Sequence, residues 1–159
     1  MRARWVLGKF CLVLASIALA ATALAADDPF AHCAAAGVDD QTRSIPAPLA
    51  EKAIALFGFP ADSAKWAQAT TVYRCMSGDV WLCNHGANLS CDKGDTHPSP
   101  ARVEAFCHSN PTVEMVPMAV TGHDTIHSFG CAGGKPRILQ SQALDGRGFI
   151  ADQWRRLEK

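Results

Sequence analysis

The chain lacks the signatures of the common catalytic and nucleotide-binding sites. It contains no G-x-S-x-G nucleophile elbow, no H-E-x-x-H zinc motif, no P-loop and no dinucleotide-binding glycine pattern. It has no C-x-x-C pair either, so a thioredoxin-like dithiol, a zinc knuckle and a C-x-x-C-H haem site all lack their characteristic spacing. We therefore expect neither a metal nor a cofactor from these motifs.

An excess of charge is also missing, since 15 Lys and Arg stand against 15 Asp and Glu. Three of the basic residues lie within the first 25 positions, so residues 26–159 carry a net charge of −3. A chain with a net negative charge lacks the basic surface that binds phosphate backbones or anionic lipid. We therefore expect no nucleic acid among its partners. Its apolar fraction of 48% is nevertheless too high for a disordered chain.

The one long apolar run lies at the N-terminus. Basic residues within positions 2–9 precede an apolar stretch over residues 10–21, and Ala23-Leu24-Ala25 is a small-residue triplet of the A-x-A kind. This order is typical of a signal peptide that is cleaved after Ala25. The run is shorter than the roughly 20 apolar residues that a spanning helix needs, so we expect no stable membrane insertion after cleavage. The alternative is an uncleaved N-terminal anchor.

We therefore predict a signal peptide over residues 1–25, a single domain over residues 26–159, and a periplasmic or secreted location. Cleavage removes Cys11 and leaves six cysteines: Cys33, Cys75, Cys83, Cys91, Cys107 and Cys131. Six cysteines in an exported chain predict three structural disulfides, for which fifteen pairings are possible.

A predicted β-hairpin reduces the number of possible disulfide pairings. Residues 70–75 and 79–83 are rich in strand-forming side chains, and Ser77-Gly78 between them is typical of a two-residue turn. Such a turn places Cys75 opposite Val80 and Cys83 opposite Val72, so the two cysteines point to opposite faces and do not bond each other. We predict the pairs Cys83–Cys91, Cys107–Cys131 and Cys33–Cys75, with an exchange of partners between Cys75 and Cys131 as the alternative.

The spacing of apolar residues and the positions of proline and glycine predict the other helices and strands. We expect a helix from Pro48 to about Phe57, a short helix over residues 64–68 with Trp66 packed inward, and a helix over residues 99–108 with Ser99 as its N-cap. We also expect an edge strand over residues 115–120, a hairpin over residues 125–131 and 137–141, and an irregular segment over residues 27–44. Residues 149–157 fit either a strand or a helix. The predicted fold is α+β: a small antiparallel sheet of hairpins with two or three short helices, held by three disulfides.

Two segments, Gly86-Ala87-Asn88-Leu89-Ser90-Cys91 and Val120-Thr121-Gly122-His123-Asp124-Thr125-Ile126, resemble parts of small exported cysteine-containing bacterial proteins. This resemblance implies export but no particular activity. The pattern aromatic-x-Cys-x-x-Gly occurs twice, at residues 73–78 and 129–134, and is similar to hairpins of periplasmic lysozyme inhibitors. Those proteins are β-barrels that insert a loop into the lysozyme cleft, and the two Pro-started helices predicted here depart from that plan.

The best catalytic candidates are His123 and Asp124, with His127 four residues further on. A general base needs an imidazole that is oriented by a carboxylate. In a strand, however, positions 123 and 127 lie about 13 Å apart, which is too far for them to hold one metal ion together. The alternative, which we favour, is that Asp124 caps the turn through backbone N–H groups.

A binding surface is the other possibility. The loop from Asn84 to Pro98 is long and polar and follows Trp81, and loops on rigid scaffolds often carry recognition. The candidate binding residues are Trp81, Asn84, His85 and Asn88. We favour an exported, non-enzymatic binding or inhibitory module that acts on another periplasmic or extracellular macromolecule or an envelope component. The alternatives are a small periplasmic hydrolase that uses His123 and Asp124, and an envelope-associated structural protein.

The cysteine pattern generates a first prediction. The purified mature protein should contain no free thiol, and its mass should be lower than that of the reduced form by about six hydrogens, one pair for each disulfide. Iodoacetamide labelling under native conditions, followed by mass spectrometry, measures this directly. Reaction of two or more cysteines would contradict the disulfide framework.

Overall fold

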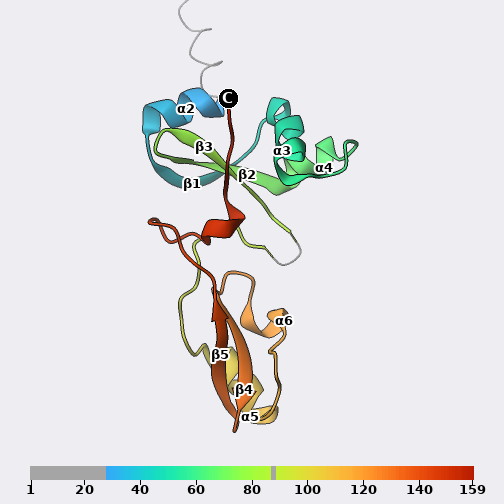
Figure 1. Ribbon diagram of the computed structural model, residues 1–159, viewed down its shortest axis with the longest axis vertical. Coiled ribbons are helices and arrows are strands. Elements are labelled where there is room, and N and C mark those ends of the chain that lie inside the picture. Colours follow the sequence, from blue (N-terminus) through green and yellow to red (C-terminus); the bar gives the residue numbers. More distant parts are fainter. Residues whose placement is uncertain (1–27, 87–88) are drawn as a thin grey trace, which may run out of the picture.

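The computed structural model describes residues 28–86 and 89–159, which form two lobes (Figure 1). The predicted signal peptide and Asn88 lie outside the described residues. The sheet lobe contains residues 29–84 together with the C-terminal strand, and the hairpin lobe contains residues 99–141. The chain crosses between the lobes twice, once within residues 89–98 and again over residues 142–150, so its C-terminal strand returns to the sheet lobe (Figure 1).

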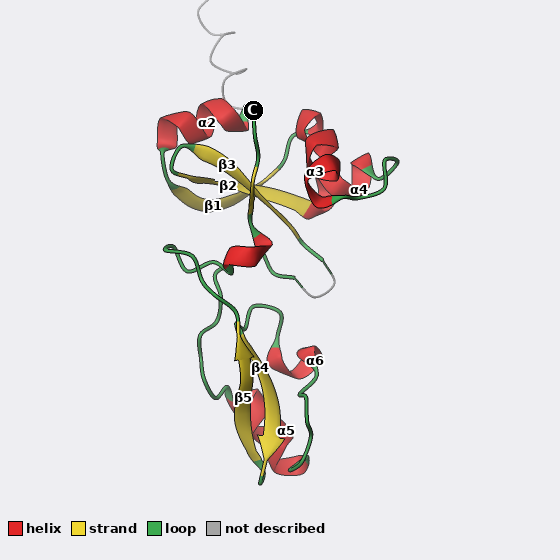
Figure 2. Ribbon diagram, in the orientation of Figure 1, coloured by secondary structure: helices red, strands yellow, loops and turns green. Residues whose placement is uncertain are grey.

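The sheet lobe is built on a four-stranded antiparallel sheet in the order β1-β2-β3-β6. Figure 2 shows β1, β2 and β3 of this sheet. These strands are β1 (Asp39–Ser44), β2 (Thr71–Met76), β3 (Asp79–Asn84) and β6 (Arg155–Arg156). The helical elements of this lobe are α2 (Pro29–Ala36), the 3-10 turn η1 (Ala47–Leu49), α3 (Ala50–Phe57) and α4 (Ala64–Thr70). Helix α3 ends where predicted, because Gly58 adopts the left-handed conformation that terminates a helix.

The β2–β3 hairpin has the predicted register. Met76 lies opposite Asp79, and Cys75 lies opposite Val80. The turn residues Ser77 and Gly78 have φ values of 55° and 81°, the positive values that a type I′ turn requires. Because side chains alternate along a strand, Cys75 joins the apolar cluster on one face of the sheet and Cys83 joins the cluster on the other face.

The hairpin lobe packs one helix against a two-stranded sheet. It contains α5 (Ala101–Ser109), α6 (Met118–Thr121), β4 (His127–Ala132) and β5 (Lys135–Ser141). The β4–β5 turn uses Gly133 and Gly134, both with positive φ. Its core consists of Val103 and Cys107 from α5 against Phe129 of β4 and Val116. The 3-10 turn η2 (Ala151–Gln153) precedes β6 and lies between the two lobes (Figure 1).

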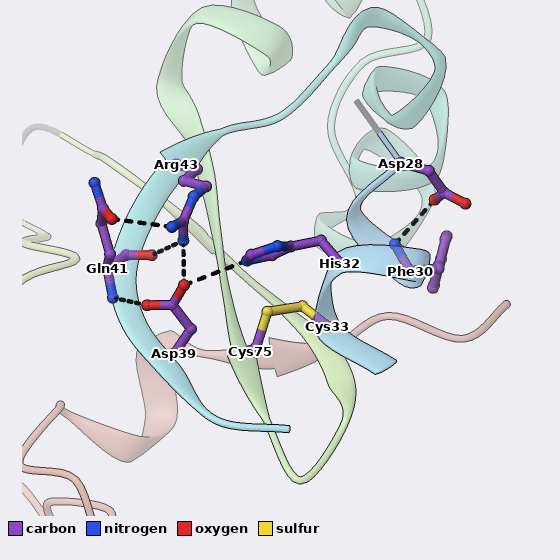
Figure 3. The surroundings of a disulfide bond; sticks show 8 residues. All are labelled: Asp28, Phe30, His32, Cys33, Asp39, Gln41, Arg43 and Cys75. Carbon is purple, nitrogen blue, oxygen red and sulfur yellow. Dashed lines mark hydrogen bonds and ion pairs between the residues drawn. A yellow bond between two sulfur atoms is a disulfide. The ribbon is translucent and has the colours of Figure 1, made fainter. Parts of the chain in front are cut away.

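All three predicted disulfide pairs are confirmed: Cys33–Cys75, Cys83–Cys91 and Cys107–Cys131. The first joins α2 to β2, next to a polar group in which Asp39 accepts from Gln41 N and contacts His32 and Arg43 (Figure 3). The fold class is therefore α+β with three disulfides, as predicted. The described residues contain five α-helices, more than the two or three expected.

The extra helices come from two segments whose prediction was wrong. The segment over residues 27–44 was predicted to be irregular, but its described part, residues 28–44, is not. Asp28 caps α2 by accepting from Phe30 N, Pro29 occupies the first helical turn, and β1 then follows. Residues 115–120 do not form a strand. Val113 and Val116 do bond to the edge of β4, but Pro117 then begins α6.

Three further details differ from the sequence analysis. Trp66 is 48% exposed rather than packed inward, although its ring centroid lies 4.9 Å from that of Phe59 in an edge-to-face arrangement. The N-cap of α5 is Pro100, and the Ser99 hydroxyl contacts Glu104 instead of a backbone N–H. The tail, predicted as strand or helix, contains both the short turn η2 and the strand β6.

A buried charge fastens the C-terminal segment to the sheet. Arg74 of β2 is fully buried, and its guanidinium carbon lies 4.1 Å from the Phe149 ring centroid and 4.6 Å from that of Trp154. It forms an ion pair with Asp145. Burial raises the pKa of Asp145, but the backbone N–H groups of Arg147 and Phe149 together with the Arg74 guanidinium outweigh it and hold that pKa below its usual value.

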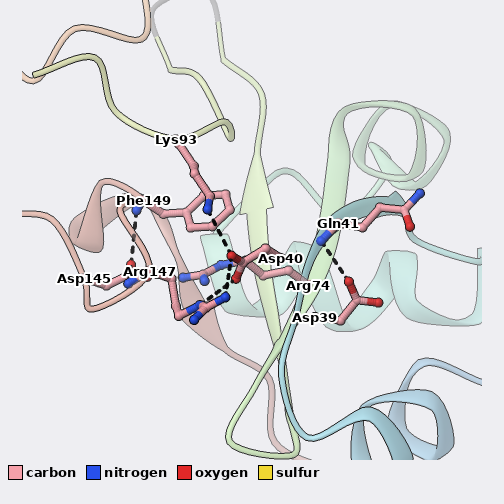
Figure 4. A network of polar contacts seen from close by, with 8 residues as sticks. All are labelled: Asp39, Asp40, Gln41, Arg74, Lys93, Asp145, Arg147 and Phe149. Atoms are coloured by element: carbon pink, nitrogen blue, oxygen red, sulfur yellow. Dashed lines mark hydrogen bonds and ion pairs between the residues drawn. The ribbon is translucent and has the colours of Figure 1, made fainter.

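A second, more exposed group reinforces the same junction. Asp40 of β1 accepts from Arg147 at 2.9 and 3.0 Å and from Lys93 at 3.0 Å (Figure 4). The hydrogen bonds from Arg147 are the main cause that lowers the pKa of Asp40 to about 2. The carboxylate is therefore charged at any physiological pH, and both crossings between the lobes are tied to β1. Among the described helices, none is long and apolar enough to cross a membrane.

The buried ion pair gives a prediction about stability. Asp145→Asn should lower the free energy of unfolding by about 3–5 kcal/mol, because it leaves the Arg74 guanidinium buried without its counter-charge. Asp79→Asn is the matched control: it removes a surface pair with Arg156 at 3.3 Å and should cost less than about 1 kcal/mol. Chemical denaturation of both variants measures the difference, and equal losses would contradict the dominance of the buried pair.

Candidate functional site

An open pocket lies in the hairpin lobe. Its volume is about 610 Å³. It is lined by residues 115–118 before and within α6, by residues of the 121–128 segment, by Gln140 and Gln142 at the end of β5, and by Asp152 of η2. The pocket thus lies at the end of the hairpin lobe that faces the sheet lobe.

One wall carries two exposed methionines. Val116 is buried in the core, and its N–H donates to Phe129 O at 2.7 Å, which fixes the backbone against β4. The neighbouring Met115 is therefore directed away from that core and is 67% exposed. Pro117 begins the single turn of α6, whose first residue, Met118, is 41% exposed. Both methionines are among the residues that line the pocket.

The end of α6 positions His123. Thr121 is buried, and its carbonyl accepts hydrogen bonds from the Arg102 guanidinium of α5. Gly122 then turns the chain with a φ of 83°, a conformation that favours glycine. His123 follows on the pocket wall and is exposed. Its imidazole makes no hydrogen bond with any of the described residues.

The second histidine, His127, is held in place. Its Nδ1 lies 2.7 Å from Ser141 Oγ, and its Nε2 lies 3.3 Å from Thr96 O. A carbonyl oxygen only accepts, so Nε2 carries the proton and Nδ1 accepts from the Ser141 hydroxyl. The centroid of the His127 ring also lies 5.8 Å from that of Phe129, in an edge-to-face arrangement. Both ring nitrogens of His127 are therefore engaged within the chain.

The first crossing between the lobes supports the pocket from behind. Asp95 N donates to Asp124 O at 2.7 Å, and Ile126 N donates to Asp95 O at 3.0 Å. Gly94 lies so close to Ile126 that a Cβ at this position would be 2.6 Å from Ile126 Cγ2. The segment over residues 94–96 is thus a structural support of the pocket.

The expected capping role of Asp124 was wrong. Its carboxylate accepts no backbone hydrogen bond from the described residues. Asp95 does accept a backbone hydrogen bond, from His97 N at 2.9 Å, but this bond belongs to the separate turn at residues 95–97. Asp124 is exposed and is not among the residues that line the pocket. His123 therefore lies on a concave wall, as a catalytic base would, but without an oriented carboxylate beside it among the described residues.

The predicted loop residues do not line this pocket. Trp81 is half-buried in β3 and packs in the cluster around Cys83 and Cys91. Asn84 is 8% exposed, and its amide donates to Thr70 and Thr71 Oγ1 at 2.7 and 2.9 Å. His85 is exposed, and Asn88 lies outside the described residues.

Sequence reasoning missed most of the wall. It identified His123 and His127, but Met115 and Met118 fell in a predicted edge strand. Gln140, Gln142 and Asp152 are brought to the pocket only by the tertiary fold. One signal in the sequence could have revealed the methionines: Pro117 lies between Met115 and Met118. A proline often opens a helical turn, and such a turn would have interrupted the predicted strand at this point.

Comparison with known proteins finds no matching family model, no similar curated protein and no similar solved structure.

The tight contact behind the pocket gives a prediction. Gly94→Ala should lower the free energy of unfolding by about 1–3 kcal/mol, because its methyl group would overlap Ile126 and Leu144. Gly146→Ala is the control, since no atom lies within 4 Å of a Cβ there, and it should change stability by about 0.5 kcal/mol or less. Urea denaturation tests both. Wild-type stability of Gly94→Ala would contradict the close packing under the pocket.

Proposed function

We propose that this chain is an exported, non-enzymatic binding module that holds or inhibits another periplasmic or secreted macromolecule. The pocket of the hairpin lobe and its rim are the contact surface. The observation that carries the proposal is that Met115 and Met118 remain exposed on the rim of a roomy, open pocket. Methionine side chains adapt their shape to a partner, and they are frequent at binding surfaces for this reason.

The mixture of side chains around the pocket supports this function. The exposed Met115 and Met118 share the pocket lining with His123, Gln140 and Gln142, so the lining combines apolar contact area with hydrogen-bonding groups. Such a combination is typical of recognition sites, in which apolar contacts contribute affinity and a few polar groups fix the orientation. A side chain projecting from a partner protein is the occupant that this composition favours.

Export is supported by the N-terminal sequence and by the cysteines. Residues 1–25 have the order of charged, apolar and small residues that a signal peptide requires. Each of the six cysteines after this segment is bonded in a disulfide, a state that persists in oxidising compartments. Together, the two observations support a periplasmic or secreted location.

The rival function, a hydrolase that uses His123 and Asp124, has less support. General base catalysis needs an imidazole within hydrogen-bond reach of an orienting group. Asp124 does not line the pocket, and His127 already uses both ring nitrogens. A binding role makes no such demand on these groups.

The proposal predicts that Met115→Asp abolishes capture of the partner. Immobilised wild-type protein is incubated with periplasmic extract or culture fluid, and the retained proteins are identified by mass spectrometry. Val38→Asp is the matched control, because Val38 is 48% exposed but belongs to the sheet lobe. A partner retained by wild type and Val38→Asp and lost from Met115→Asp supports the proposal.

Two results would overturn it. One is the absence of any specifically retained macromolecule from both fractions. The other is a partner that Met115→Asp and the wild type retain equally, which would place the contact surface elsewhere on the chain.

A further inference from the structure

We propose that the same pocket binds a soft monovalent metal ion, Cu(I), through the thioether sulfurs of Met115 and Met118 and the imidazole of His123. This inference goes beyond the proposed function, because it needs no partner macromolecule. It assigns to the pocket a ligand that none of the catalytic or metal motifs of the sequence indicates.

The three donor residues all line the same pocket, and they lie within nine residues of one another in the chain. Met115 precedes α6, Met118 opens it and His123 follows it. The backbone that carries them is fixed at both ends, by Val116 bonding to β4 and by Arg102 donating to the Thr121 carbonyl. The methionine side chains, with their freely rotating bonds, then bring their sulfurs to a common point at low cost.

All three donors are free to bind. Met115 is 67% exposed and Met118 is 41% exposed, so neither sulfur is committed to the core. His123 makes no hydrogen bond with any described residue, in contrast to His127, whose two ring nitrogens are occupied. The pocket therefore offers two thioethers and one imidazole.

The identity of the ion follows from the softness of these donors. Thioether sulfur is a soft ligand that selects Cu(I), whereas carboxylate and carbonyl oxygen suit harder cations. The described residues contain no group of three or more His, Cys, Asp or Glu side chains that could hold a metal ion. A site for Zn²⁺ built from its preferred ligands is therefore missing from that part of the chain, and the thioethers set the preference.

The disulfides make methionine the only soft sulfur available in the described part of the chain. Cys33, Cys75, Cys83, Cys91, Cys107 and Cys131 are all paired, so none offers a thiolate. Thioethers do not form disulfides, so pairing of the cysteines leaves the methionine sulfurs available as ligands. The third described methionine, Met76, lies at the end of β2 in the sheet lobe and serves as an internal control.

The experiment is an anaerobic titration of the purified mature protein with Cu(I) in competition with bicinchoninate. The wild type should withdraw one equivalent of Cu(I) from the chelator. The double variant Met115→Leu, Met118→Leu keeps the apolar shape and should bind at least about tenfold more weakly, as should His123→Ala. Met76→Leu should bind like the wild type. Circular dichroism of each variant confirms that the fold is retained.

A second readout reports the ligands themselves. Ag(I) is a redox-inert probe of the same softness, and it should shift the methyl NMR signals of Met115 and Met118 while leaving that of Met76 in place. Failure of the wild type to compete for Cu(I), equal affinity of the Met115→Leu, Met118→Leu variant, or an Ag(I) shift confined to Met76 would overturn the proposal.

The two proposals fail separately. Leucine preserves the apolar rim, so the double leucine variant should lose Cu(I) and still capture the partner macromolecule. Met115→Asp should lose the partner. If the double leucine variant loses Cu(I) binding, the metal site is supported. If, in addition, the wild type captures no partner, only the proposed macromolecular function is refuted.

Discussion

The fold depends on the burial of one charged side chain. Arg74 is fully buried against the rings of Phe149 and Trp154, and Asp145 supplies its counter-charge. A buried guanidinium is costly unless it is paired, so the segment over residues 145–154 has to lie where it does. This segment connects the hairpin lobe to β6, and its position sets the position of the second lobe relative to the sheet.

Two of the disulfides fasten other segments to the sheet, one on each of its faces. Cys75 and Cys83 belong to adjacent paired strands but point to opposite faces. Cys75 fixes α2 on one face, and Cys83 fixes the start of the first crossing on the other. The third bridge lies within the hairpin lobe and joins α5 to β4. Both lobes, each with a small core, thus have their own covalent restraint, which compensates for the limited apolar area that a small core buries.

The pocket is a consequence of this arrangement. Its walls are short turns that gain their rigidity from contacts behind them: Arg102 on the Thr121 carbonyl, Thr96 on His127, and Asp95 on the backbone of Asp124 and Ile126. With the backbone held in this way, the exposed side chains are free to serve a ligand. The two proposed ligands, a macromolecule and Cu(I), use the same methionines through different properties: apolar surface in one case and sulfur lone pairs in the other.

The amino-acid sequence by itself determined the local and covalent features. The β2–β3 register, the helix stop at Gly58 and the exclusion of a Cys75–Cys83 bridge follow from side-chain alternation and from backbone preferences, which operate over a few residues. The disulfide pairs were inferred from the same parity together with chain order, and the structure has the same pairs.

Only the tertiary structure decided the positions of the two lobes and the pocket. Residues 115–120 have the composition of an edge strand, yet contacts with β4 are followed by a helical turn at Pro117. Arg74 gives no sign in the sequence of being buried, because its partner Asp145 is 71 residues away. Asp152 likewise reaches the pocket wall from the far end of the chain. Such long-range pairings depend on the packing of whole elements, which no local pattern of residues encodes.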